Sequence, residues 1–210
     1  EGLLPQVVEV VKTYAKFNGV QLGFIPCADG VTSYGALLAE LAAGDVAGVL
    51  VPGINKYGII EDFTGFADAV HAQKGMFMVY SDPSSLAVIK TPGEWGADIV
   101  THSTTKYIDG HGVSVGGAII DAGKFDWMAH KDKFPGLCTP DDSYHGIVYA
   151  EKFGKEGAFI TKATAQLMRD FGSIQSPQHA FYINLGIESL HVRMKRHCEN
   201  GQKVAEFLSK

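Results

Sequence analysis

The feature that most constrains the fold is a repeated alternation between short apolar stretches and longer segments of helical periodicity. The stretches 47–51, 76–80 and 97–101 are apolar without a regular polar alternation, which is typical of strands buried on both faces of a sheet. Parallel strands need crossover connections, and helices usually supply them. The sequence therefore predicts an α/β fold with a mainly parallel sheet flanked by helices.

Periodicity and turn signals predict the remaining elements. Apolar residues at helical spacing mark the amphipathic segments, and Gly, Asp and Pro mark their ends. The expected helices are 4–17, 33–43, 61–73, about 157–172 and 177–209, and the expected further strands are 20–25 and 113–121, with a turn at Asp29-Gly30.

Composition excludes several classes of protein. A chain of 210 residues with 46% hydrophobic and 20% charged residues is neither disordered nor collagen-like. The net charge of −5, without a long basic block, argues against nucleic acid or an anionic membrane as partner. No apolar run reaches the ~20 residues that span a bilayer, and the first residues do not resemble a signal peptide. We expect a cytoplasmic protein. It begins with Glu1 instead of Met, as a processed chain or a piece of a longer one would.

The cysteines and histidines predict no metal site. Cys27, Cys138 and Cys198 are far apart and odd in number, so they form neither a disulfide framework nor a paired metal motif. His191 and His197 are spaced wrongly for one metal-binding face of a helix. A reducing compartment is the expected environment.

Polar side chains follow three of the predicted strands, where open α/β sheets bind ligands. Asn55 follows 47–51, Asp82 follows 76–80, and the run 102–106 (His-Ser-Thr-Thr-Lys) follows 97–101. Together they supply an amide, a carboxylate, hydroxyls and an amine to one edge of the sheet.

That combination suits a cofactor with a phosphate, an aldehyde and a basic ring nitrogen. The hydroxyls of Ser103 and Thr105, with loop N–H groups, can hold a phosphate. Lys106 can form an imine with an aldehyde. Asp82 can keep a pyridinium nitrogen protonated, which makes the ring an electron sink. We therefore expect pyridoxal phosphate (PLP).

The run GADIVTHSTTKYIDGHGVSVGGAIIDAGKFDW at 96–127 resembles the cofactor-lysine segment of the Cys/Met-metabolism PLP enzymes, closest to O-acetylhomoserine sulfhydrylases, and the resemblance continues to about residue 209. It implies part of the large domain of a fold-type I transferase. It also implies that Lys106 is the Schiff-base lysine, that Ser103 and Thr105 bind the phosphate, and that Asp82 pairs with the ring nitrogen. The implied function is γ-replacement on a small amino-acid substrate.

Residues 1–100 resemble a different branch of this fold, the glycine-cleavage P-protein (glycine dehydrogenase, decarboxylating), in the subunit or half that lacks the cofactor lysine. Ile54-Asn55-Lys56-Tyr57-Gly58 is a partial match to its motif. In sulfhydrylases the corresponding Asn lies near the ring hydroxyl, which implies a cofactor contact for Asn55. The chain is thus expected to be one α/β domain, 1–210, fused near Gly96 and lacking the family's N-terminal flank and C-terminal small domain.

Other interpretations remain open at this stage. Asp82 can be a helix cap before Pro83, and Ser103 and Thr105 can cap the next turn. Ser103-Thr104-Thr105-Lys106 fits the S-x-x-K motif of serine β-lactamases, but the accompanying motifs are absent from the sequence. A glycine-dehydrogenase-like subunit, a non-catalytic recombined α/β chain and a homo-oligomer are further possibilities.

Overall fold

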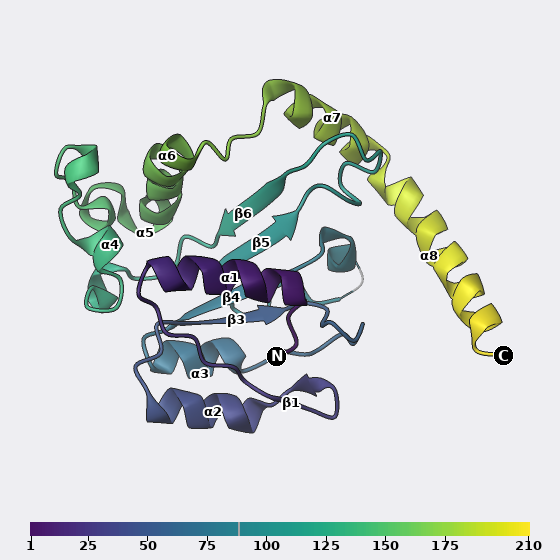
Figure 1. The fold of residues 1–210 in the computed structure, drawn as a ribbon, viewed down its shortest axis with the longest axis horizontal. Helices are drawn as coiled ribbons and strands as arrows, with labels where there is room; N and C mark the ends of the chain where they lie inside the picture. Colours follow the sequence, from purple (N-terminus) through teal and green to yellow (C-terminus); the bar gives the residue numbers. More distant parts are fainter. Residues whose placement is uncertain (88) are drawn as a thin grey trace.

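A four-stranded sheet forms the centre of the protein, as a computed structural model describes it for residues 1–87 and 89–210. The strands lie in the order β3-β4-β5-β6 (Figure 1). β3 (Gly48–Pro52), β4 (Met76–Tyr80) and β5 (Ile99–Ser103) are parallel, and β6 (Gly117–Asp121) runs antiparallel to β5. The predicted α/β fold with a mainly parallel sheet is confirmed.

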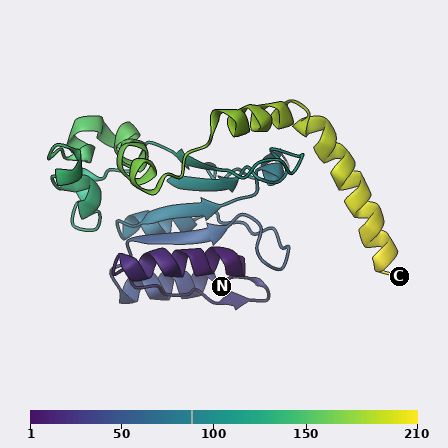
Figure 2. The same ribbon diagram turned by 45° about the horizontal axis from the view of Figure 1, so that its top comes forward.

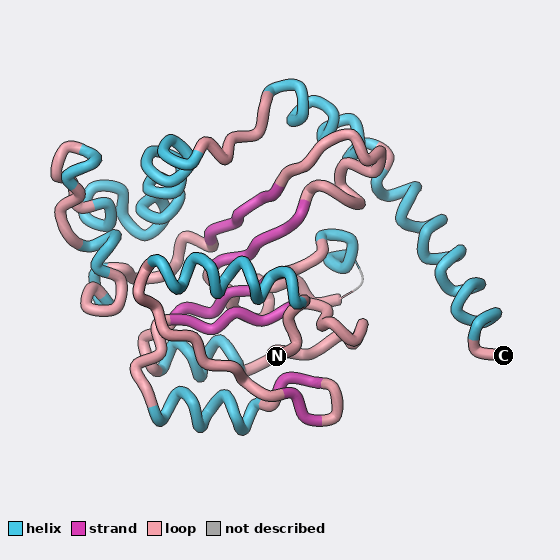
Figure 3. The backbone as a smooth tube through the Cα atoms, viewed as in Figure 1, coloured by secondary structure: helices cyan, strands magenta, loops and turns pink. Residues whose placement is uncertain are grey.

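Helices surround this sheet and extend beyond it, as the tube in Figure 3 makes clear. The α-helices are α1 (Pro5–Phe17), α2 (Tyr34–Ala43), α3 (Phe66–Ala72), α4 (Pro135–Cys138), α5 (Tyr149–Lys162), α6 (Arg169–Phe171), α7 (Pro177–Glu188) and α8 (Leu190–Leu208). The smaller elements are the strands β1 (Cys27–Ala28) and β2 (Val31–Thr32), the 3-10 helices η1 (Pro83–Ala87), η2 (Met128–His130) and η3 (Asp142–Tyr144), and the π-helix η4 (Ala163–Met168).

Local sequence signals explain several element boundaries. The Ser33 hydroxyl accepts the N–H of Ala36 at 3.2 Å and caps α2, and Ser176 caps α7 in the same way. Asp29 and Gly30 both have positive φ, 52° and 82°, so they form a tight turn between β1 and β2. The predicted turn is confirmed.

One face of the sheet packs against α2 and α3. Because side chains alternate along a strand, Val49 and Val51 of β3 and Phe77 and Val79 of β4 point to this face. They meet a layer of buried side chains from the two helices and the segments beside them: Leu37, Leu41, Phe63, Phe66, Ala67, Val70 and Trp95. This first core holds the parallel strands together.

The opposite face of the sheet carries a second, smaller core. Met76 and Ile99 point to this side and pack with aromatic and apolar residues of the segment that follows β6. These are Phe125, Trp127, Leu137, Tyr149, Ala150 and Ala158. The same strands therefore serve both cores, with successive residues of one strand belonging to different layers.

Several sequence predictions differ from the structure. The helix expected at about 157–172 is α5, η4 and α6, which begin at Tyr149, and the helix expected at 177–209 is divided into α7 and α8. Residues 20–25 are not a strand, because no neighbouring strand pairs with them in the described chain. β6 begins at Gly117, not Val113, because the N–H groups of Val113 and Gly116 bond to the side chains of Asp109 and Thr105. The helix expected at 61–73 is only α3, since Gly65 at φ 86° precedes it.

α8 departs from the rest of the molecule. It has no buried residue, and it extends away from the sheet from the end of α7 (Figures 1 and 2). In the described part of the chain, no helix combines the length and apolar character that crossing a membrane requires.

Candidate functional site

The ends of β4 and β5 bring two of the predicted site residues together. Tyr80 pairs with Thr101, and the Ser81 N–H donates to the Thr101 carbonyl at 3.0 Å. Asp82 and Ser103 each lie two residues beyond this pair, so the register makes them neighbours. Ser103 is the last residue of β5, not part of the loop after it as the sequence suggested.

His102 links the end of β5 to the end of β4 by a hydrogen bond. Its Nδ1 lies 2.7 Å from the Ser81 carbonyl oxygen. Because a carbonyl only accepts hydrogen bonds, the proton must be on Nδ1 for this contact to form. The imidazole therefore has a structural role at the edge where Asp82 and Ser103 meet.

Asp82 has one carboxylate oxygen engaged and one available. Oδ1 accepts the N–H of Ser84 at 2.8 Å and its hydroxyl at 2.5 Å, which is a cap on η1. Oδ2 has no hydrogen-bond partner among the residues described. A helix cap and a partner for a ligand nitrogen are thus compatible functions of the same side chain.

Thr105 uses its hydroxyl inside the protein. The hydroxyl donates to the Gly116 carbonyl at 3.2 Å and accepts the Gly116 N–H at 3.1 Å. This pair of bonds ties the start of the loop after β5 to the residues just before β6. In this arrangement the Thr105 hydroxyl orders the loop. The hydroxyl of Ser103, which is half-buried at the end of β5, has no hydrogen-bond partner among the described residues.

Lys106 is exposed and lines a cavity of about 530 Å³. The polar side chains around it are hydroxyls, cationic groups and imidazoles, with no carboxylate among the described lining residues. They belong to Thr105, Lys106, Tyr107, Ser114, His179, Arg193 and His197. Such a wall favours an anionic ligand. Asp82 and Ser103 do not line this cavity.

Unpartnered buried oxygens occur beside the lysine. The hydroxyls of Thr104 and Ser114 are buried without a hydrogen-bond partner among the described residues, and Ser114 also lines the cavity. Buried hydroxyls are normally satisfied, so these two are available to a ligand or an ordered water.

Asp109 stabilises the turn that follows Lys106. Its side chain is fully buried, and Oδ2 accepts the Val113 N–H at 3.1 Å. Burial raises the pKa of the Asp109 carboxyl, but the N–H groups of residues 111–114 oppose it, and together they hold the pKa below its usual value. An ionised Asp109 therefore organises the loop from inside.

Asn55 lies in a different environment from the other predicted residues. Its amide nitrogen donates to the Gly30 carbonyl and to Glu61 Oε1, both at 2.8 Å. Its amide oxygen accepts the N–H groups of Tyr57 and Ile59. The buried Asn55 side chain thus has its polar atoms engaged in fixing the loop after β3.

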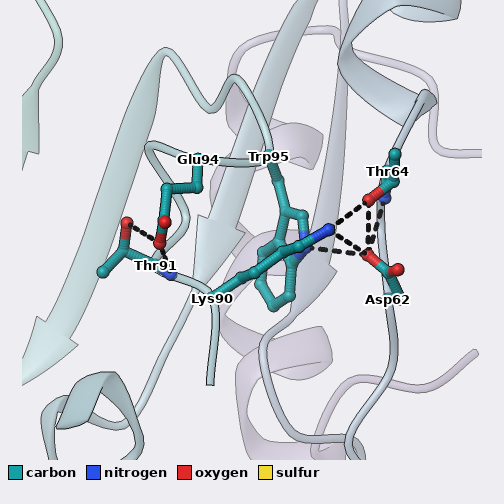
Figure 4. Close-up of polar contacts among 6 residues, drawn as sticks. All are labelled: Asp62, Thr64, Lys90, Thr91, Glu94 and Trp95. Carbon is teal, nitrogen blue, oxygen red and sulfur yellow. Dashed lines mark hydrogen bonds and ion pairs between the residues drawn. The ribbon is translucent and has the colours of Figure 1, made fainter. Parts of the chain in front are cut away.

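A second polar cluster, shown in Figure 4, is structural in character. Asp62 Oδ1 accepts the Thr64 hydroxyl at 2.7 Å and the Trp95 indole N–H at 3.0 Å. Lys90 Nζ donates to the Thr64 hydroxyl at 2.9 Å and pairs with Asp62. Hydrogen bonds from the Thr64 hydroxyl and N–H lower the pKa of the Asp62 carboxyl. Glu94 caps its own turn through Thr91. These groups satisfy one another and anchor Trp95 in the first core.

The donor set around Lys106 suits pyridoxal phosphate. An exposed amine, a neighbouring cationic wall and unpartnered hydroxyls match its aldehyde and phosphate, and Asp82, at the end of β4 outside this cavity, has a carboxylate oxygen that could pair with the ring nitrogen. Among the described residues, no group of three or more His, Cys, Asp or Glu side chains is arranged to hold a metal. Ser114, His179, Arg193 and His197 were not predicted, because no sequence signal links residues so far apart.

Solved structures identify the class of fold. A putative O-acetylhomoserine (thiol)-lyase from Campylobacter jejuni, which contains N'-pyridoxyl-lysine-5'-monophosphate, superposes with a TM-score of 0.81 at 22% identity. It is matched by all of this chain, which covers 50% of that protein. The fold is that of the fold-type I PLP-dependent enzymes.

The sequence comparisons then give the family. Residues 52–210 match the Cys/Met metabolism PLP-dependent enzyme family, and the chain belongs to it. Sulfhydrylase FUB7 of Gibberella moniliformis is 41% identical over 149 residues, and O-acetyl-L-homoserine sulfhydrylase of Leptospira meyeri is 44% identical over 148. These matches cover 71% and 67% of this chain but 34% and 33% of the relatives. The chain therefore spans about a third of the length of these relatives, and pyridoxal phosphate is the cofactor of its family.

The expected likeness to glycine decarboxylase is present in part. The structure of a glycine decarboxylase (P-protein) is similar over 58% of this chain, with 28% identity and a TM-score of 0.50. The Cys/Met family match, however, begins at residue 52, well before the join expected near Gly96. The two likenesses overlap, so they do not by themselves establish a fusion.

Proposed function

We propose that Lys106 is the residue that attaches pyridoxal phosphate. The observation that carries this proposal is the exposed Lys106 amine in a cavity whose polar wall is cationic and hydroxyl-bearing. Lys106 Nζ would hold pyridoxal phosphate through its aldehyde, in a condensation that releases water. Family membership supports the assignment, since the family is PLP-dependent.

Other residues at the sheet edge complete the proposed site. Asp82 Oδ2 would pair with the protonated ring nitrogen while Oδ1 keeps η1 in place. Ser103 and Thr105 would donate to the phosphate, and Thr105 would give up its bond to the Gly116 carbonyl to do so. Asn55 orders the loop after β3 at the same edge. When bound, pyridoxal phosphate supplies an electron sink for negative charge on an amino-acid substrate.

The proposed activity of the complete protein is γ-replacement on a small amino acid of the O-acetylhomoserine type. Its support is the identity to O-acetyl-L-homoserine sulfhydrylase of Leptospira meyeri, 44% over 148 residues. Within this chain, Lys106 would supply the amine that moves protons on the substrate.

Covalent labelling tests the site. The chain is mixed with pyridoxal phosphate and reduced with borohydride, and the modified lysines are mapped by peptide mass spectrometry. We expect Lys106 to be labelled faster than Lys203, an exposed lysine of α8 that serves as an internal control. Equal labelling of the two lysines would contradict the proposal. An Asp82→Asn variant is expected to shift the absorption of the bound cofactor, because an amide does not stabilise a pyridinium proton as a carboxylate does.

We also propose that residues 1–210 fold as a single α/β domain, with a P-protein-like segment 1–100 and a sulfhydrylase-like segment 96–210. The support is that β4 and β5 contribute residues to both cores. Trp95 belongs to the first core and Trp127 to the second. Single-tryptophan variants, Trp95→Phe and Trp127→Phe, should report one common unfolding transition in urea. Two separate midpoints would indicate two domains.

The fusion itself is a proposal about ancestry. The glycine decarboxylase likeness over 58% of the chain supports it. Phylogenies built separately from residues 1–95 and 96–209 are expected to place the two segments in different families. A common placement of both segments among the sulfhydrylases would refute a fusion.

A further inference from the structure

The junction between α7 and α8 packs against the turn that carries Lys106. Gly186 of α7 is buried, and a Cβ there would overlap the carbonyl oxygens of Ile108 and Asp109. Only glycine allows the helix to come this close to the backbone of the turn. The loop after β5 and the helices beyond residue 176 are thus in direct contact, although some 80 residues separate them in sequence.

Arg193, in the first turn of α8, bridges this contact with its guanidinium. Nη1 donates to the Tyr107 carbonyl at 3.0 Å, and Nη2 donates to the Gly186 carbonyl at 2.7 Å and reaches the Ile108 carbonyl at 3.5 Å. Nε donates to the Ser189 hydroxyl at 3.0 Å. One side chain therefore links the residue directly after Lys106 to the end of α7.

Gly110 and His197 also contribute to the contact between α8 and the Lys106 turn. Gly110 has φ 71°, and a Cβ at this position would overlap Arg193. His197, one turn further along α8, lies against Tyr107 with a ring separation of 5.6 Å and an edge-to-face angle of 73°. The outer side of the turn thus contacts α8. Within the turn, the Gly110 N–H donates to the Lys106 carbonyl at 2.7 Å.

We propose that Arg193 is a positioning residue for Lys106, an inference that rests on the proposed function. By fixing the carbonyls of Tyr107 and Ile108, it sets the backbone from which the Lys106 side chain emerges. The position of the Lys106 amine in the cavity then depends on this backbone. The planar fork of arginine reaches several acceptors at once, and lysine, as a point charge on a flexible stem, does not reproduce this geometry.

A purely structural role would have a different signature. If Arg193 only attached α8 to the molecule, its loss would free α8 and leave the reactivity of Lys106 unchanged. If it positions the turn, its loss changes Lys106 itself. Arg196 provides the matched control, because it lies on the same helix, is exposed, and pairs only with Glu199 among the described residues.

The experiment compares Arg193→Ala, Arg193→Lys and Arg196→Ala with the unchanged chain. The first readout is the rate of borohydride-trapped labelling of Lys106 by pyridoxal phosphate, relative to Lys203. A displacement of about 1 Å can reduce a rate about a hundredfold, so we expect Arg193→Ala to lower the ratio by about tenfold or more. The labelling ratio of Arg193→Lys should lie between those of Arg193→Ala and the unchanged chain, and the ratio of Arg196→Ala should equal that of the unchanged chain.

The second readout needs no cofactor. Amide hydrogen exchange at Asp109 and Gly110, whose N–H groups close the turn, should be about tenfold faster in Arg193→Ala and unchanged in Arg196→Ala. Arg193→Lys, which keeps the charge and the helix, tests the proposal even if the alanine variant folds poorly.

The possible failures are distinguishable. If Lys106 of the unchanged chain is labelled no faster than Lys203, the proposed function fails. If Lys106 is labelled selectively and keeps that selectivity in Arg193→Ala and Arg193→Lys, the positioning role of Arg193 is overturned while the proposed function stands.

Discussion

The first core and the Lys106 turn are held by opposite kinds of contact. Phe63, fully buried, packs with Phe66 and Trp95 at ring separations of 5.0 and 5.4 Å. The Lys106 turn is held instead by hydrogen bonds from Arg193 and by the buried carboxylate of Asp109. Apolar burial supplies most of the folding free energy but is non-directional, whereas hydrogen bonds define direction. Stability and site geometry are therefore carried by different parts of the molecule.

The largest expected effect is loss of the aromatic centre of the first core. Phe63→Ala should lower the free energy of unfolding by about 3–5 kcal/mol, since it removes a fully buried ring and leaves a cavity. Urea denaturation measures this change. Phe207→Ala in α8, where the side chain is 74% exposed, is the control and should change stability by less than about 0.5 kcal/mol. Similar losses for the two variants would remove the distinction between core and periphery.

The next effect is on the contact between α7 and the Lys106 turn. Gly186→Ala places a methyl group against the carbonyls of Ile108 and Asp109, which are backbone atoms and cannot rotate away. We expect a cost of about 1–3 kcal/mol from overpacking. Amide exchange in residues 104–113 should accelerate, while β3 and β4 keep their protection. Unchanged exchange in the turn would show that α7 does not hold it.

A smaller effect concerns pH and the helical region beyond β6. The Asp141 carboxylate accepts from Lys162 at 2.6 Å and from Ser143, and these bonds lower its pKa from 3.8 to about 2. Because the folded pKa lies below the unfolded one, the stabilisation is full above about pH 4 to 5 and disappears as pH falls toward 2. We expect Asp141→Asn to remove about 1 kcal/mol of acid-dependent stability. Denaturation midpoints between pH 5 and 2 measure it, and parallel pH profiles for both chains would contradict the assignment.

The smallest effect is a gain in α8. A Cβ at Gly201 meets nothing within 4 Å, so alanine there is free to favour the helix. Gly201→Ala should stabilise α8 by about 0.5–1 kcal/mol, in contrast to the same substitution at position 186. Amide exchange within α8 provides the measurement. A destabilising result would mean that this face of α8 contacts something close.

The parts of the fold that sequence predicts well are those determined by local pattern. β3 and β4 and the helices α1 and α2 lie within a residue or two of their expected positions, because apolar runs and caps such as Ser33 mark them directly. Residues 20–25 have the same apolar character, but a strand also needs a partner, which composition does not reveal.

The residues of the candidate site likewise differ in whether local sequence indicates them. Asp82, Ser103 and Lys106 were found from their positions at strand ends, a local signal. Arg193 was not found, because its contact with Tyr107 spans 86 residues and depends on how α7 and α8 are placed. The antiparallel direction of β6 was likewise unforeseen, since an apolar run carries no information about strand direction.

If α8 turned about Ser189, the helix would act as a lever held to the Lys106 turn near this pivot, by Arg193 and His197. Its 19 residues extend about 28 Å at ~1.5 Å per residue, while Arg193 lies only about 6 Å from the pivot. A swing of about 5 Å at the far end thus moves the guanidinium by roughly 1 Å. The short arm would reduce such a motion about fivefold before it reached Tyr107.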